Sequence, residues 1–514
     1  YRRSLNDSPA YRLNHEEVEK SLEEGIYYYE NMSPTEAVAD DFGAVKSMIF
    51  ERQKLIDGKP RGSGEFVELA AKTVCVAAGT SPNTIYEREY PGTFKKDKWN
   101  NFFQPHTLNG TFHEDENGFF TGYNKDGKYI TYYGDNHPRY AGNVVKAMAS
   151  AKDGYPNVVY AVFGKATERP SEPQSSWFSF RKMLDGELLA TVTDVVRLTK
   201  TIVEIIVHAP AAARHFHPGQ FYRLQNFEKY STSIEGTALT MEGLALTGAW
   251  VDKEKGLLSL IVLEMGSSSR QCAMLKRGER VVVMGPTGTP TEIPENETVL
   301  LAGGGLGNAV LFSIAKALKE NNNKVIYFAG YKFGEDLFKR EEIESATDQV
   351  IWSSDAGRHI DSNRPQDAHF RGNIIQAMLA YHNGELGVER LYPFHDVDRI
   401  IAIGSDRMMA AVKAARRDGP LAPLMKQGHA AIGSINSSMQ CMMKEVCAQC
   451  LQKHVDPITQ EETGFVFSCF NQDQPLDMVD FKNLNDRLKT NSLSEKLSLA
   501  YFQRLLTIHP IEAV

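Results

Sequence analysis

The stretch VLLAGGGLGNAVLFSIAKAL at residues 299–318 decides the fold of this chain. An apolar run enters a glycine-rich turn and continues directly into apolar residues at helical spacing, which predicts a strand, a turn and a helix. Such glycines let the backbone approach a pyrophosphate, and a helix N-terminus supplies N–H donors. A tight strand-to-helix turn uses glycine in any case, so this loop alone leaves both interpretations open. The residues predicted to contact a dinucleotide here are Gly303, Gly304, Gly305, Leu306, Gly307 and Asn308.

The segments on either side extend this pattern into a multidomain α/β plus β protein. Strands alternate with helices over 296–430, which predicts a parallel α/β domain. Short β-like runs separated by Gly and Pro fill 186–295 and predict an antiparallel barrel or sandwich. The Pro- and Ser-rich stretch KATERPSEPQSSW begins at Lys165, and we expect a linker over 166–185.

The first 165 residues form a separate region. We expect helices over 1–60, where apolar residues recur at helical spacing among acidic ones, and a buried strand in KTVCVAAGT at 72–80. A strand, a loop and a helix starting near Asn143 follow in YITYYGDNHPRYAGNVVKAMASAKDG.

Composition excludes several classes of partner. The chain of 514 residues has a formal net charge of -8, so no basic excess indicates nucleic acid or anionic lipid. No apolar run approaches the roughly 18 to 20 residues that span a bilayer, and we expect a cytoplasmic protein. The chain begins with Tyr1 rather than Met, which suggests a fragment or a processed product.

Cysteines are concentrated near the end of the chain. Four of the six follow the pattern C-x5-C-x2-C-x18-C, whereas Cys75 and Cys272 lie far away. In a reducing compartment such a cluster predicts a metal site, and thiolates suit either zinc or iron. Structural zinc usually takes two separated pairs, and this spacing is nearer to the plant-type 2Fe-2S pattern. The predicted ligands are Cys441, Cys447, Cys450 and Cys469.

The order HPGQF, MGSSS, VMGPTG and AGGGLG along 217–307 resembles the ferredoxin-reductase family. The resemblance implies that the barrel carries FAD and the α/β domain binds NAD(P)H. Residues 186–480 look like the electron-transfer subunit of dihydroorotate dehydrogenase and the small subunit of the NADH-dependent ferredoxin:NADP oxidoreductase, both of which end in a 2Fe-2S segment, here 431–514. The implied flavin contacts are Pro218, Gly219, Gln220, Gly266, Ser267 and Ser268, with Gly404 near the nicotinamide.

The sequence departs from that family in two places. The family shows an Arg-Pro-x-Ser/Thr flavin motif after the PGQ strand, and the comparable stretch TMEGLALTGA at 240–249 has no arginine. The family's Cys-Gly-Pro near the nicotinamide is replaced by Ile403, Gly404 and Ser405, so no cysteine role in hydride transfer is carried over. Lys332 is a candidate for a 2′-phosphate contact, and an exposed lysine explains it equally.

Residues 1–165 resemble the last part of the glutamate synthase small subunit family, which binds FAD and NADPH. VCVAAGTSPN and YGDNHPRYAGNVVKAMASAKDG carry this likeness. It implies flavin contacts at Gly134, Asp135, Asn143, Val144 and Val145, where an Asp would bond a ribityl hydroxyl and a helix N-terminus would face the flavin. The family's N-terminal half does not precede residue 1, so we expect it on another polypeptide or as a missing segment.

These observations predict an iron-sulfur flavoprotein oxidoreductase that moves electrons between NAD(P)H, FAD and a 2Fe-2S cluster to a further redox domain or partner, such as a glutamate-synthase-like enzyme. A first alternative is a ferredoxin:NADP transhydrogenase, bifurcating or not. A second alternative is a non-catalytic, zinc-binding interaction module.

Overall fold

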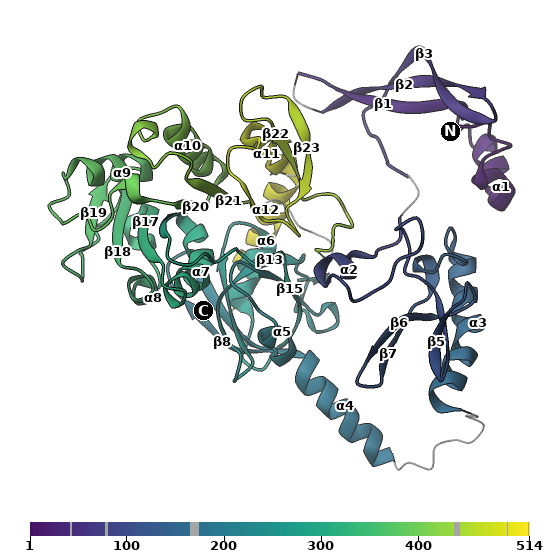
Figure 1. Ribbon diagram of the computed structural model, residues 1–514, viewed down its shortest axis with the longest axis horizontal. Coiled ribbons are helices and arrows are strands. Elements are labelled where there is room, and N and C mark those ends of the chain that lie inside the picture. The colour runs from purple at the N-terminus through teal and green to yellow at the C-terminus, as the bar shows by residue number, and fades with distance from the viewer. Residues whose placement is uncertain (42–43, 78–80, 165–173, 436–442, 491, 512) are drawn as a thin grey trace.

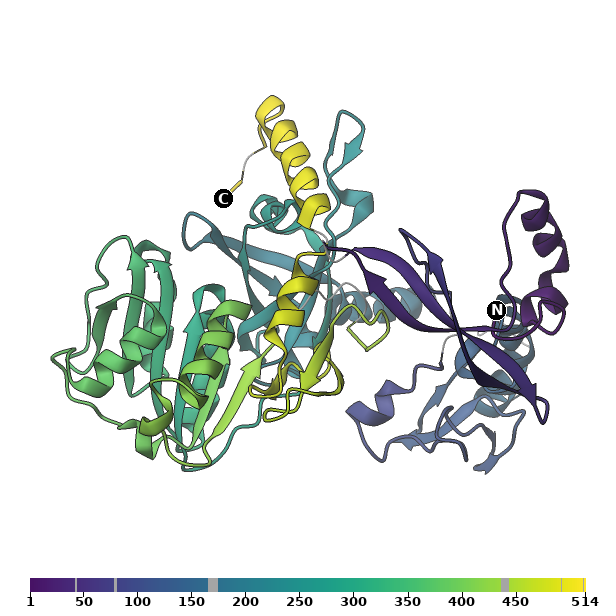
Figure 2. The same cartoon turned by 90° about the horizontal axis from the view of Figure 1, so that it is seen from above.

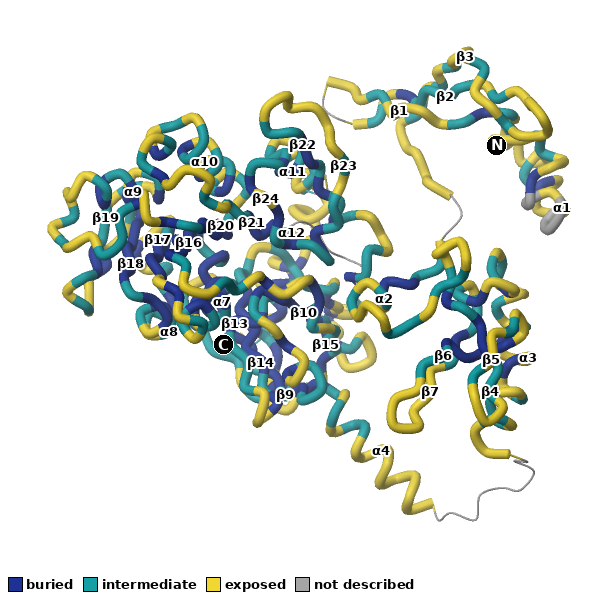
Figure 3. Tube along the Cα trace, viewed as in Figure 1, coloured by how far each residue is buried: buried dark blue, intermediate teal, exposed yellow. Residues whose placement is uncertain are grey.

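The computed structural model describes residues 1–41, 44–77, 81–164, 174–435, 443–490, 492–511 and 513–514. Figure 1 separates the chain into two parts, with a barrel and a large sheet on one side and the segments of the first 164 residues on the other. The view from above shows the same separation (Figure 2). Buried residues are concentrated in the barrel and the large sheet, and the first part contains few of them (Figure 3).

The N-terminal segment contains one helix and a three-stranded antiparallel sheet in the order β1-β2-β3. The prediction of helices throughout 1–60 is therefore wrong, because only Pro9–Glu23 is helical among its described residues. Asp57 and Gly58 both have positive φ and form the tight turn between β2 and β3, which is the backbone that an Asp-Gly hairpin requires. The elements are α1 (Pro9–Glu23), β1 (Met32–Ala39), β2 (Val45–Ile56) and β3 (Lys59–Ala70).

The next segment does not contain the buried strand expected at 72–80. Residues 71–77 have no strand pairing, Val76 is 86% exposed, and 78–80 lie outside the described residues. A four-stranded sheet in the order β5-β4-β6-β7 follows, together with a helix whose N-cap is Asn143, as expected. The elements are α2 (Ile85–Glu89), β4 (His106–Asn109), β5 (Thr111–Glu114), β6 (Phe120–Lys125), β7 (Lys128–Thr131), η1 (Gly134–Asn136) and α3 (Val144–Phe163).

The segment expected as a linker begins with residues 165–173, which lie outside the described part of the chain. It continues as a helix, α4 (Gln174–Leu188), that leads into the first barrel strand. Figure 1 shows α4 extending away from the barrel. The connection between the two parts is therefore helical from Gln174 onward.

The barrel predicted over 186–295 is confirmed. Six antiparallel strands close in the order β10-β13-β14-β9-β8-β15. Val203, Ile205 and Val207 of β9 alternate into its fully buried interior, as the two-residue period of a strand requires. The strands are β8 (Ala190–Arg197), β9 (Ile202–His208), β10 (Phe221–Asn226), β13 (Leu244–Asp252), β14 (Leu257–Leu263) and β15 (Arg280–Thr287). Short elements between them are α5 (Pro210–Arg214), β11 (Ser233–Ile234), β12 (Thr237–Ala238), α6 (Ser267–Gln271) and η3 (Cys272–Met274).

The parallel α/β domain is also confirmed. A seven-stranded sheet has the order β19-β18-β17-β16-β20-β21-β24, and all its pairs except β21–β24 are parallel. Helices cover both faces, and Ile202 and Ile261 of the barrel join one of the two cores. The elements are β16 (Thr298–Gly304), α7 (Asn308–Glu320), β17 (Lys324–Phe333), α8 (Arg340–Ser345), β18 (Gln349–Ala356), β19 (Ala368–Arg371), α9 (Ile374–Asn383), β20 (Arg399–Ile403), α10 (Asp406–Arg417) and β21 (Ala430–Ser434).

The C-terminal segment combines a β-hairpin with two helices. Phe502 and Leu505 of the last helix pack on Ile234 and Leu239, which lie in the insertion between β10 and β13. Among the described residues, no helix has the length and apolarity needed to span a bilayer. The elements are β22 (Leu451–Val455), β23 (Glu462–Phe467), β24 (Asp473–Pro475), α11 (Phe481–Leu488) and α12 (Ser492–Ile508).

Candidate cofactor site and cysteine segment

The glycine-rich loop joins β16 to α7 through one 3₁₀ turn, η4 (Gly305–Gly307). A methyl group at Gly303 would lie 2.0 Å from Oδ1 of Asn308, and one at Gly307 would lie 2.5 Å from the carbonyl oxygen of Ile403. Asn308 is fully buried, donates to the Gly305 carbonyl at 2.9 Å and accepts from the Tyr327 hydroxyl at 2.7 Å. Close packing therefore leaves no room for a side chain at Gly303 or Gly307, and the two hydrogen bonds of Asn308 fix the loop.

Gly404 lies directly beside this loop, at the carboxyl end of β20. Its Cβ position is 3.2 Å from the Cα of Gly304 and 2.4 Å from Cε of Met408. Two adjacent parallel strands, β16 and β20, therefore bring the predicted nucleotide residues to one edge of the sheet. Ligands of open α/β sheets bind at this edge.

The barrel contributes Pro218, Gly219 and Gln220 at the start of β10. Gly219 has a φ of +84°, and its Cβ position would be 1.9 Å from Oγ1 of Thr291. The Gln220 amide accepts from the His217 N–H at 2.9 Å and donates to the Gly288 carbonyl at 2.8 Å. Gln220 therefore fixes this turn through both ends of its side chain.

A cavity of about 240 Å³ lies where the barrel meets the α/β domain. It opens between the predicted flavin turn at Gly219 and the predicted nucleotide loop at Gly307, two regions that are 88 positions apart in the sequence. A concave site where two domains meet is a common position for a bound cofactor. The lining residues are Gly219, Phe221, Ala245, Leu246, Thr247, Ile261, Leu306, Gly307, Val310, Ser434 and Gln472.

The predicted phosphate residues Gly266, Ser267 and Ser268 lie at the start of α6. A methyl group at Gly266 would meet no atom within 4 Å, so this backbone faces open space. The Ser268 hydroxyl accepts from the Glu242 N–H at 3.0 Å, which ties α6 to the chain just before β13. The three residues are therefore accessible to a ligand bound along the barrel.

The cysteine segment packs against the barrel next to the cavity. Cys450 and Cys469 are buried in one apolar cluster with Met443 and Phe221, and Phe221 also lines the cavity. Cys447 is exposed, and Cys441 lies outside the described residues. A single aromatic side chain therefore separates the cavity from two of the four predicted ligands.

The thiols of Cys450 and Cys469 interact directly with each other. A hydrogen bond with the Cys469 side chain lowers the pKa of Cys450 to about 7, against the opposing effect of burial. A lowered thiol pKa favours the thiolate, which is the form that binds metal. Within the described residues, no group of three His, Cys, Asp or Glu side chains is arranged to hold a metal ion. That finding does not include Cys441.

Gln472 and Thr289 attach the cysteine segment to the flavin side of the barrel. The Gln472 amide donates to the Gly219 carbonyl at 3.1 Å and to the Thr289 carbonyl at 2.5 Å. The Thr289 N–H donates to the carbonyl of Phe470 at 2.7 Å. Burial raises the pKa of the neighbouring Asp473 carboxyl, which accepts from the Thr291 hydroxyl.

The residues predicted in the first part of the chain lie together but are open to solvent. Gly134 has a φ of +71° and donates its N–H to the Ser150 hydroxyl at 2.8 Å, while Asp135 accepts from the Gly142 N–H at 3.3 Å. Asn143 caps α3 by accepting from the Lys146 N–H. Val144 and Val145 are 73% and 76% exposed. A flavin contact at these residues stays a prediction.

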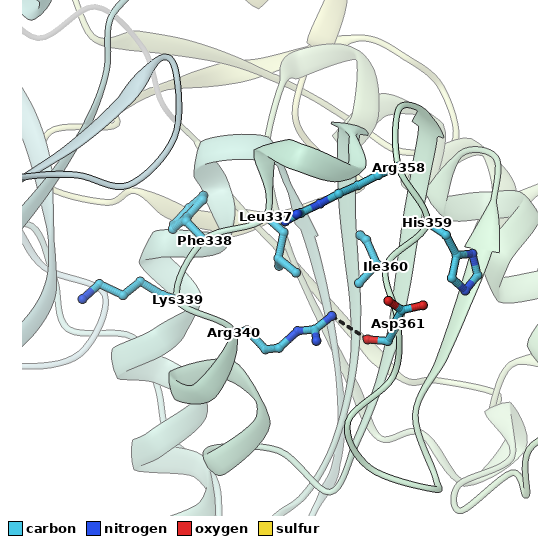
Figure 4. Close-up of a pocket in the computed structure, with 8 residues that line it drawn as sticks. All are labelled: Leu337, Phe338, Lys339, Arg340, Arg358, His359, Ile360 and Asp361. Atoms are coloured by element: carbon cyan, nitrogen blue, oxygen red, sulfur yellow. Dashed lines mark hydrogen bonds between the residues drawn. The ribbon is translucent and has the colours of Figure 1, made fainter.

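A second cavity, of about 380 Å³, lies in the loops that follow β17 and β18 (Figure 4). Arg340 donates to the backbone carbonyl of Asp361 at 2.6 Å, and Lys339 forms an ion pair with Glu204 at 2.9 Å and points away from the cavity in Figure 4. Lys332 is exposed, with its ammonium group over the Phe333 ring, and does not line this cavity. The structure therefore gives Lys332 no special role.

Sequence reasoning missed Phe221, Thr247 and Gln472, all of which line the central cavity. Phe221 directly follows the quoted HPGQ, and Gln472 lies three positions after Cys469. Their position depends on which loops meet in space, and no local pattern contains that information.

The barrel followed by a parallel α/β domain is the ferredoxin-reductase-like fold. No family model matches the chain. An uncharacterized protein of Rickettsia prowazekii is 31% identical over 510 residues, which are 97% of this chain and 55% of the relative. The chain therefore spans about half the length of that relative.

Two further similarities concern the second part of the chain. The dihydroorotate dehydrogenase B (NAD(+)) electron transfer subunit homolog of Thermotoga maritima is 26% identical over 271 residues, 51% of this chain and 85% of that protein. A structure of the NADH-dependent reduced ferredoxin-NADP oxidoreductase is 26% identical and covers 62% of this chain and 99% of its own, with a TM-score of 0.49. The first of these two similarities confirms the predicted resemblance to electron-transfer subunits.

Proposed function

We propose that this chain is an NAD(P)H-dependent flavoprotein that transfers electrons between a nicotinamide, FAD and a 2Fe-2S cluster. The observation that carries the proposal is the cavity where Gly219 of the barrel and Gly307 of the nucleotide loop meet, with Phe221 joining it to Cys450 and Cys469. FAD supplies the conversion of a two-electron donor into single electrons. The similarity to a dihydroorotate dehydrogenase electron transfer subunit supports the same role.

The residues of the chain bind and orient the cofactors in this proposal. The backbone of the 303–307 loop would face the nucleotide. Gly219 and Thr247 would line the space for the flavin ring, and Phe221 would exclude water between that space and the cysteines. Exclusion of water strengthens the electrostatic effects of the surrounding dipoles. No side-chain acid or base is assigned, because the cofactors carry the chemistry.

The cluster in this proposal is held by Cys441, Cys447, Cys450 and Cys469. The burial of Cys450 and Cys469 in the same apolar cluster supports it. Burial in an apolar shell also tunes the potential of such a cluster.

The first part of the chain is the candidate electron acceptor. Arg88 forms an ion pair with Glu445, Lys444 forms one with Glu89, and the Arg88 guanidinium lies 4.7 Å from the centroid of the Phe470 ring. These contacts attach α2 to the cysteine segment. They support transfer from the cluster to a redox group held by the first part and its partner, as in a glutamate-synthase-like enzyme or a transhydrogenase.

The test is anaerobic turnover of FAD-loaded protein with NADH or NADPH and ferricyanide as a one-electron acceptor. We expect reduction of ferricyanide at more than one turnover per second, a common range for enzymes of this size. A flavin-loaded protein that oxidises neither nucleotide would contradict the proposal. Reduction of added NADP⁺ to NADPH by NADH together with reduced ferredoxin would select the transhydrogenase.

A further inference from the structure

The guanidinium of Arg223 has an unusual position on the barrel. Arg223 lies on β10 and is paired with Ala245 of β13, and Phe221, two residues earlier on the same strand, lines the central cavity. Side chains two residues apart point to the same face of a strand, so Arg223 lies on the cavity side, about 7 Å further along. Tyr222 and Leu224, between and after them, are fully buried in the barrel interior.

This guanidinium fills the space above a glycine of the neighbouring strand. A methyl group at Gly243 would lie 2.0 Å from Nε of Arg223 and 2.3 Å from Nη2. The position therefore needs glycine only because Arg223 occupies the space that a side chain would take. The sequence 240–249 itself contains no arginine, so the positive charge over this stretch comes from the next strand.

Arg223 has little to bind within the protein. Its Nε is buried without a hydrogen-bond partner, and its one hydrogen bond among the described residues joins Nη1 to Sδ of Met284 at 3.7 Å. A half-buried guanidinium with an unsatisfied N–H is costly, and a bound anion would remove that cost.

The surroundings match the phosphate end of a dinucleotide. Glu242, next to Gly243, donates its N–H to the hydroxyl of Ser268, which ties the start of α6 to the stretch that Arg223 covers. Arg270, two residues after Ser268, also has a buried Nε without a partner. Arginine is suited to phosphate because its planar fork offers two parallel donors.

We propose that Arg223 binds the phosphate groups of the FAD whose ring occupies the cavity at Phe221 and Thr247. Arg223 supplies from β10 the cation that the stretch 240–249 lacks. This inference rests on the proposed function, because it assigns one contact of the same cofactor.

The test measures FAD binding by the full chain, using fluorescence quenching of added FAD and the absorbance of retained flavin near 450 nm. We expect Arg223→Leu to raise the Kd for FAD by about tenfold to a hundredfold, the loss of one charge-assisted phosphate contact. Arg223→Lys keeps the charge without the fork and should lie between. Arg280→Leu, an exposed arginine on strand β15, is the matched control and should bind FAD as the wild type does.

Moving the arginine to the neighbouring strand distinguishes a role of its guanidinium in FAD binding from a role in packing over residue 243. The double variant Arg223→Leu with Gly243→Arg frees the space above residue 243 and returns a guanidinium to it from the other strand. We expect this variant to recover most of the FAD affinity that Arg223→Leu loses, with unchanged circular dichroism throughout.

Two results would overturn the inference. Either Arg223→Leu binds FAD as tightly as the wild type, or its loss is not recovered by Gly243→Arg in a folded double variant, which would give Arg223 a purely structural role. A wild-type protein that binds no FAD is a different result, because it overturns the proposed function as well.

Discussion

Two helices that both follow a predicted cofactor turn differ sharply in what they bury. α7 follows the glycine-rich loop and buries seven of its thirteen residues, including Leu311, Ile314 and Leu318, between the sheet and the barrel. α3 follows the Gly134–Asn136 turn and, in its described residues, buries only Ser150 and Gly154. The apolar residues that a helix leaves exposed add nothing to its stability, because helices in proteins are stabilised mainly by burying an apolar face.

The difference shows which part of the chain buries its own apolar surface. The barrel and the parallel sheet share a core, so each supplies the surface that covers the other. The first part instead exposes Val144, Val145 and Met148 on α3, each at least 70% exposed, and Tyr155 and Phe163 further along. Apolar surface of this extent is typical of an interface. We infer that another polypeptide, or a further segment of a longer protein, covers α3.

The largest expected effect concerns the cysteine segment. Cys450→Ser should reduce the iron content of anaerobically purified protein to near zero and leave bound FAD unchanged, because a 2Fe-2S cluster requires its full set of thiolates. Iron and flavin are measured on the same sample. Cys75→Ser, which changes an exposed cysteine of the first part, is the control and should retain iron. Unchanged iron in Cys450→Ser would exclude this residue as a ligand.

Hydrogen exchange tests the comparison of the two parts directly. We expect amides of β9, whose Val203, Ile205 and Val207 are fully buried, to exchange at least a thousandfold more slowly than those of α3 in the isolated chain. Exchange is followed by mass spectrometry of peptides from both regions. Equal protection of α3 and β9 would show that the first part is stable without a partner.

A smaller effect is expected at the nucleotide loop. Gly303→Ala places a methyl group 2.0 Å from Oδ1 of Asn308, which forces the turn to shift. Overpacking of this kind costs about 1 to 3 kcal/mol, so the KM for the nicotinamide nucleotide should rise about tenfold while FAD stays bound. Gly186→Ala in α4, where a methyl group meets nothing within 4 Å, is the control. A wild-type KM in Gly303→Ala would show that the loop does not position the nucleotide.

The smallest effect concerns the contact between the two parts. Arg88→Glu breaks the ion pair with Glu445 and places two carboxylates together, and we expect it to weaken the docking of α2 by about 1 kcal/mol, or roughly fivefold in the exchange rate of amides 85–90. The double variant Arg88→Glu with Glu445→Arg should restore protection, and 0.5 M salt should reduce the difference. If the single reversal leaves exchange unchanged, α2 does not depend on this pair.

Much of the second part could be predicted from the sequence because its signals are local. The run into Gly303 and out along α7 combines strand and helix periods within twenty residues, and the PGQ turn precedes β10 directly. The first part gave weaker signals. The amphipathic acidic pattern predicted helices over 1–60, and the Asp57-Gly58 turn that makes β2 and β3 a hairpin was missed.

The site itself could be predicted only in pieces. Spacing singled out the cysteines and glycines, but the role of Phe221 between them depends on how the C-terminal segment folds back onto the barrel. Arg223 depends on strand register, because a shift of one residue would turn it into the barrel interior. Contacts of this kind are set by tertiary structure and not by local sequence.

The central claim is tested most directly by the visible spectrum of anaerobically purified protein, recorded before and after NADH, with iron and zinc assayed on the same sample. The account predicts flavin bands near 450 nm on a broad cluster absorption, about two iron atoms per chain, and bleaching of both by NADH. A colourless protein that contains one zinc ion per chain and does not respond to NADH would contradict it, and would identify the cysteines as a structural metal site.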